Sequence, residues 1–107
     1  MVNFEYDNEN SRNTSSTIGT TAVKIAEKLP VGIRQVIVLT NVSTTGQIIT
    51  ISTGGANAAG AGIPLRIGDK WTESTDSGFN PTNEQIWAIA DAANATLAVY
   101  ERQKVVK

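Results

Sequence analysis

The chain has 107 residues, a length that suits one domain built around one hydrophobic core. Its nine basic and ten acidic residues leave a formal net charge of -1, without the basic excess that nucleic-acid binders usually show. Cysteine and histidine are both absent, which excludes disulfides, thiolate nucleophiles, a Ser–His–Asp triad and the common structural zinc sites. No apolar run approaches the roughly 20 residues that a membrane-spanning helix needs, so neither a nucleic-acid nor a membrane partner is expected.

Residues 1–17 are rich in Asn, Ser and Thr and lack hydrophobic periodicity. Such a composition offers little apolar surface to offset the entropy of ordering, so the segment is predicted to be an extended N-terminal arm outside a domain of residues 18–107. Two interpretations stay open: a floppy end, or an arm that orders against a neighbouring subunit. Phe4 and Tyr6, two aromatics on one side of the arm, would anchor it in the second case. The segment also lacks the apolar core of a signal peptide, which predicts synthesis in the cytoplasm.

From residue 20 onward the chain predicts short strands separated by turns. Apolar side chains two residues apart mark these strands, which are expected at 21–28, 34–41, 47–53, 63–67, 71–74, 84–91 and 95–102. Seven to eight short strands at near-regular spacing favour an all-β fold, a single antiparallel β-sandwich resembling a jelly roll. The predicted core consists of Ile37, Leu39, Ile49, Ile51, Leu65, Ile86, Leu97 and Val99.

Two segments allow other interpretations. Residues 84–106 contain many good helix formers, so a helix must be weighed there. Asn94, Thr96 and Tyr100, together with the two-residue spacing of the apolar positions, favour strands instead. The glycine-rich segment 54–62 lacks the GK[ST] ending of a phosphate-binding loop, and it is predicted to be a flexible connection.

Some strands are apolar on both faces, which poses the question of what covers the second face. Val36 and Val38 alternate with Ile37 and Leu39, and Trp87 shares its side with Ile89. A soluble monomer seldom exposes a large apolar patch. We therefore expect one face to form the core and the other to lie in a subunit interface, with Val36, Val38 and Trp87 as candidate interface residues. A register slip of one residue would exchange the two faces, so the pattern alone does not assign them.

Catalysis is not expected. The carboxylate pairs Asp69 with Glu73 and Asp76 with Glu84 could act as acid and base, but they lie in turns or at strand ends, where solvated carboxylates are ordinary. We therefore predict no enzyme activity, no catalytic residues, no metal and no cofactor. Trp71 could stack on a sugar, although a large aromatic in a small β domain more often belongs to the core or an interface.

Four segments occur together in one order: GIRQVIVLTNVS, QIITIS, GIPLRIGDKWTES and EQIWAIADAANATLAVYER. This order resembles that of the small β-sandwich structural proteins of tailed bacteriophage virions, over residues 20–102. The matching positions are Arg34, Ile37, Leu39, Asn41, Ile49, Ile51, Gly62, Ile63, Leu65, Gly68, Ile86, Trp87, Ala88, Ile89, Leu97 and Val99. The Asn-rich arm and the basic tail from residue 102 depart from the pattern.

The resemblance implies a non-enzymatic protein located in the virion. Its first expected function is capsid decoration: a cement protein, as a homo-oligomer and most simply a trimer, bound to the major capsid protein or another virion protein. The alternative is a tail fibre or spike module that binds a host-surface glycan or receptor through Trp71 and the loop 74–83. Copy number and position in the particle would distinguish the two.

Overall fold

The computed structural model describes residues 9–75 and 81–104, and these residues form eight β-strands. The strands are β1 Glu9–Ile18, β2 Val23–Ala26, β3 Arg34–Asn41, β4 Ile49–Thr53, β5 Ile63–Leu65, β6 Lys70–Ser74, β7 Ile86–Ala90 and β8 Ala95–Lys104. All seven strands expected from the sequence are present, with shifts of a few residues at their ends. The helical interpretation of the C-terminal segment is wrong, because β7 and β8 occupy it.

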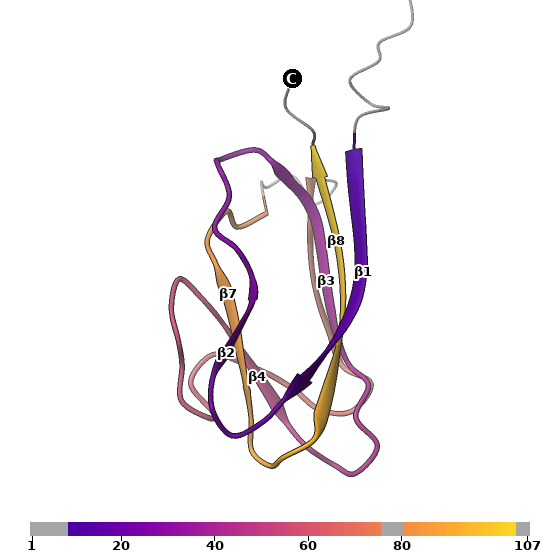
Figure 1. Cartoon of the computed structure of the whole chain (residues 1–107), viewed down its shortest axis with the longest axis vertical. Helices are drawn as coiled ribbons and strands as arrows, with labels where there is room; N and C mark the ends of the chain where they lie inside the picture. The colour runs from indigo at the N-terminus through magenta and orange to yellow at the C-terminus, as the bar shows by residue number, and fades with distance from the viewer. Residues whose placement is uncertain (1–8, 76–80, 105–107) are drawn as a thin grey trace, which may run out of the picture.

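The strands form two four-stranded antiparallel sheets packed face to face (Figure 1). Sheet A has the order β1-β8-β3-β6, and sheet B has the order β2-β7-β4-β5. The chain passes from one sheet to the other at every connection except β4 to β5. This interleaving is the topology of a jelly roll. The predicted fold class, an all-β antiparallel sandwich of jelly-roll type, is therefore confirmed.

The core lies between the two sheets and consists of the inward side chains of both. All eight residues predicted for the core are buried, with exposed fractions of 3% or less. Ile37 and Leu39 are fully buried, whereas Val36 and Val38 on the opposite face of β3 are only partly buried. The inner face of β3 is thus the one that carries Ile37 and Leu39. Ile18, Ile25 and several alanines complete the core.

The boundary of the predicted arm needs correction. Residues 9–17 belong to β1, which pairs with β8 along ten residues without a register shift. The composition is poor in apolar residues because β1 is an edge strand: of its side chains from Ser11 to Ile18, whose burial the structure describes, most are exposed and only Ile18 is fully buried. Backbone pairing with β8 needs no apolar side chains, so hydrophobic patterning did not detect this strand. Phe4 and Tyr6 lie outside the described residues.

The glycine-rich segment 54–62 covers part of the outer face of sheet B, at the left of Figure 1. Asn57 donates to the backbone oxygen of Thr50 (3.2 Å), and the Gly60 N–H donates to the Thr50 hydroxyl (3.1 Å). Thr50 is 2% exposed and Ile89, its partner on β7, is 8% exposed, although both lie on the outer face. The second face of sheet B is therefore partly covered by the chain itself rather than by another subunit.

Candidate functional site

The structure does not bring the predicted interface residues together. Val36 and Val38 lie on the outer face of sheet A, and Trp87 lies on the outer face of sheet B. These two faces point in opposite directions, because the core separates the sheets. One flat contact therefore cannot cover both. Phe4 and Tyr6 fall outside the described residues.

The outer face of sheet A carries Val36 and Val38, which are partly buried. On it, Val36 is paired in register with Arg102 and Ser74, and Val38 with Tyr100 and Thr72. A shallow hollow of about 430 Å³ lies beside Val38, bordered by Asn13 and Ser15 of β1, Thr40 of β3, and Ala98 and Tyr100 of β8. The small side chain of Ala98 leaves this depression between larger neighbours. No charged side chain lines it.

Trp87 is partly buried on the outer face of sheet B, where its register partners on both sides are polar. Its Nε1 donates to Oε1 of Gln85 at 2.8 Å, and its register partners are Lys24 on β2 and Ser52 on β4. The indole is therefore hydrogen-bonded and flanked within the protomer, so this position does not require a subunit to cover it.

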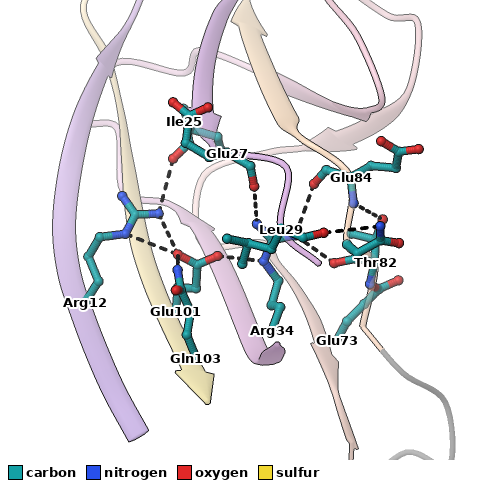
Figure 2. A network of polar contacts seen from close by, with 11 residues as sticks. Arg12, Ile25, Glu27, Leu29, Arg34, Glu73, Thr82, Glu84, Glu101 and Gln103 are labelled. Atoms are coloured by element: carbon teal, nitrogen blue, oxygen red, sulfur yellow. Dashed lines mark hydrogen bonds and ion pairs between the residues drawn. The ribbon is translucent and has the colours of Figure 1, made fainter. Parts of the chain in front are cut away.

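A network of charged side chains, built on the buried pair Arg34 and Glu101, lies at one end of the sandwich (Figure 2). Arg34 Nε donates to Glu101 Oε2 at 2.6 Å, and both side chains are at most 2% exposed. Arg12, on β1, donates to the other carboxylate oxygen through Nη2 at 3.1 Å and also reaches the carbonyl of Ile25 at 3.2 Å. Figure 2 shows the Glu101 carboxylate between the two guanidinium groups. Gln103 Nε2 completes its contacts at 3.0 Å.

The other donors of Arg34 bind backbone carbonyls across the gap between the sheets. Nη1 donates to Thr82 (2.6 Å) and Glu84 (3.0 Å), just before β7, and Nη2 donates to Glu27 (2.9 Å), just after β2. Arg34 thus fixes two connections of sheet B against a strand of sheet A. A β-bulge at Gln35 sets this direction, because the register shifts between Arg34 and Val36. Without the extra residue Arg34 would face outward, like Val36 and Val38.

Opposing effects set the protonation of Glu101. Burial would raise the pKa of its carboxyl group, but hydrogen bonds from Arg34 and Gln103 and the positive charges of Arg34 and Arg12 outweigh burial. The pKa of Glu101 therefore lies below its ordinary value. A carboxylate held ionised between two arginines is a structural ion pair rather than an acid or base ready for proton transfer.

The other end of β3 has a second polar contact between the sheets. Asn41 is fully buried, and its Nδ2 donates to the carbonyls of Gln47 and Leu65, both at 2.8 Å. Its Oδ1 accepts from the Ser43 N–H at 3.0 Å. The Arg and Asn that begin and end this strand, noticed in the sequence only as part of a family pattern, thus link the sheets at both ends.

The remaining candidates for chemistry are separated and engaged elsewhere. Asp69 accepts from the Arg66 N–H within a turn, Glu73 accepts from the Thr82 N–H, and Glu84 lies 3.7 Å from Lys28. Asp76 lies outside the described residues. Trp71, considered as a sugar platform, packs against the core cluster. Trp71 is the register partner of Leu39, so the two side chains lie on the same face of sheet A, which is the face toward the core.

Within residues 9–75 and 81–104, no group of three or more Asp, Glu, His or Cys side chains could hold a metal ion. The same residues include no helix long and apolar enough to cross a membrane.

The comparisons with known proteins give a likeness of fold. No protein-family model matches the chain, and no curated protein matches it in sequence. Among solved structures, the chain is similar to a protein of Bacillus endospore appendages, which are described as "a novel family of disulfide-linked pili". The match has a TM-score of 0.57 and 15% sequence identity, and it covers 92% of this chain and 88% of that one. The two chains thus share a fold over nearly their whole lengths.

Proposed function

We propose that the chain is a non-enzymatic structural subunit that acts through contacts with other proteins of a large particle. The observation that supports this best is how the buried ion pair is used: Arg34 and Arg12 of sheet A both bind the Glu101 carboxylate, and their other donors bind backbone carbonyls in or next to the strands of sheet B. No buried polar cluster in the described part of the chain is left to bind a substrate. The fold likeness to an appendage protein agrees with such a role.

The finer proposal is a capsid decoration protein of a tailed bacteriophage, bound as a homo-oligomer to the major capsid protein or another virion protein. The ordered segments that resemble small virion proteins support it, as does the uncharged hollow beside Val38. Binding energy would come from many weak contacts repeated over the shell. Phe4 and Tyr6 would add anchors from the segment that precedes β1.

Assembly of these 107 residues is noncovalent in this proposal. The appendage protein is described as forming disulfide-linked pili, whereas this chain contains no cysteine. Packing and backbone pairing must therefore replace disulfide links between these subunits, and denaturant alone, without a reducing agent, should release the subunit from the particle.

The test is to locate and count the protein in purified particles by cryo-electron microscopy and quantitative mass spectrometry. A uniform coat at hundreds of copies supports capsid decoration. A few copies at a vertex or tail would favour the fibre or spike alternative, which the inward packing of Trp71 already makes less suitable for glycan binding. Absence from particles would contradict both.

A pair of substitutions tests whether the outer face of sheet A makes the contact. Val38→Lys changes that face, and Val31→Lys is the matched control at a loop position that is 76% exposed. Attachment of the two variants to the particle is compared.

A further inference from the structure

The two sheets have four edge strands, and three of them are unsuited to pairing with another chain. β2 has four residues and an irregular register between Lys24 and Ala26. β5 has three residues and contains Pro64. β6 has five residues and begins with an exposed lysine, Lys70. Short edges, bulges, proline and lysine are the features by which proteins prevent edge-to-edge association.

The fourth edge, β1, has none of these features, and its inward-pointing Arg12, a charge of the kind that can also protect an edge, is paired with Glu101. It is ten residues long, pairs with β8 without a shift, and contains neither proline nor lysine. Figure 1 shows it as the outermost strand of sheet A, and within the described residues β8 is its one strand partner. A row of backbone donors and acceptors on its far side is therefore available for another strand.

We propose that β1 pairs with β1 of a second copy of this chain, antiparallel, about a two-fold axis near Asn13 and Thr14. Length favours this partner, because the other edges of the protein have three to five residues and only a second β1 matches all ten. The two A sheets would then join into one continuous eight-stranded sheet. Such an isologous contact closes on itself and forms a dimer.

Charge also favours self-pairing. The outward side chains Ser11, Asn13, Ser15 and Thr17 are uncharged and exposed. Arg12 points inward, where the Glu101 carboxylate lies 3.1 Å away and offsets its charge. β1 also carries Glu9, but in a pairing centred on Asn13 and Thr14 neither Glu9 nor Arg12 is directly opposite its own copy. Two copies therefore meet without the like-charge repulsion that destabilises directly opposed residues. This inference does not depend on the proposed function, because the contact uses the strand edge and leaves the outer face of sheet A available.

Single cysteines provide a clean test, since the chain has none of its own. Directly opposed residues in an antiparallel pair have Cα atoms about 4.5–5.5 Å apart, within the range of about 4.4–6.8 Å that a disulfide bridges. Full-length variants Ser11→Cys, Asn13→Cys and Ser15→Cys would be oxidised alone and in mixed pairs. We expect cross-links whose residue numbers add to a constant of about 26 to 28, as antiparallel strands require: Asn13 with Asn13 and Ser11 with Ser15, or Asn13 with Ser15.

The control variants separate this contact from others. Thr72→Cys, on the outer face of the opposite edge strand β6, should not cross-link to itself or to the β1 variants. The double variant Asn13→Lys/Ser15→Lys should elute as a folded monomer where the unmodified chain elutes as a dimer, while Thr72→Lys should remain dimeric. A monomeric unmodified chain, cross-links between β1 and Thr72→Cys, or a dimer that survives the double variant would each overturn the proposal.

Discussion

Arg34 shows how a buried charge can be acceptable in a small β domain. Taking a guanidinium out of water costs several kcal/mol, which its ion pair offsets only if the remaining donors are also satisfied. Arg34 makes four hydrogen bonds, one to Glu101 and three to backbone carbonyls. Removing Arg34 leaves the Glu101 carboxylate buried without this partner, and neutralising Glu101 leaves the Arg34 charge buried without its counterion. The contributions of the two residues to stability therefore depend on each other.

Replacing Glu101 by Gln should destabilise the protein by about 3–5 kcal/mol, since it leaves the charge of Arg34 buried without its counterion. Glu84→Gln is the matched control: its carboxylate is 46% exposed and 3.7 Å from Lys28, so its loss should change the free energy of unfolding by less than about 0.5 kcal/mol. Urea denaturation of both variants measures the difference. Equal losses would mean that the network does not stabilise the fold.

Acid should weaken the same contact. The pKa of Glu101 is lower in the folded protein than its ordinary value of 4.5, so the stability that this group contributes is complete above pH 4.5. It is lost as the pH falls through the lower, folded pKa. Denaturation midpoints measured from pH 7 down to pH 2 should therefore fall more steeply below pH 4.5 in the unmodified protein than in Glu101→Gln. Parallel curves would contradict this assignment.

The burial of individual charged side chains was the hardest feature to predict from the sequence. The core residues followed from alternation, because a buried face repeats every second position. Arg34 and Glu101 could not be assigned in the same way, since a charged residue at a strand end is ordinarily exposed and the bulge at Gln35 is not visible in the pattern. The available signal was that Glu101 continues the inward series of Leu97 and Val99 on β8.

At the level of elements, the predicted strands were those with apolar periodicity, and the missed strand was the one without it. β1 is stabilised by backbone hydrogen bonds to β8, by Ile18 at its end and by the ion pair of Arg12. Deleting residues 1–16 would thus remove most of a strand rather than a free arm, so such a deletion cannot test an arm in isolation. The polar composition of β1 indicated that its side chains are exposed, but it did not indicate that its backbone forms a strand.

The glycine-rich connection illustrates how one position restricts a loop. Gly62 has φ +141°, and a Cβ there would collide with the carbonyl oxygen of Ile51 on the adjacent strand. Gly62→Ala should therefore displace β5 from β4 and lower the melting temperature clearly. Gly55→Ala in the same loop is the control, because its Cβ would meet nothing within 4 Å and its φ is not in the left-handed range. Equal melting temperatures for the two variants would show that the loop accommodates a Cβ at residue 62 without displacing β5.

At the level of the whole molecule, the strands that are apolar on both faces have two different explanations. On sheet B the segment 54–62 binds Thr50 on the outer face, where Thr50 and its register partner Ile89 are both buried. On sheet A the described residues leave Val36 and Val38 only partly buried, with an uncharged hollow beside Val38. The sequence identified the unusual faces but not their covering, because a glycine-rich loop carries no pattern that shows where it packs.

The two faces of β3 now predict opposite outcomes for neighbouring substitutions. Leu39→Lys places an unpaired charge among fully buried side chains, so it should cost more than roughly 4 kcal/mol and unfold the domain. Val38→Lys points away from the core and should leave the fold and its melting temperature nearly unchanged. If the outer face of sheet A is the contact proposed above, Val38→Lys should abolish attachment to the particle, whereas Val31→Lys should attach normally. Calorimetry and particle co-sedimentation measure the two effects separately. A stable Leu39→Lys variant would refute the assignment of the inner face, and full attachment of Val38→Lys would show that sheet A is not the bound surface.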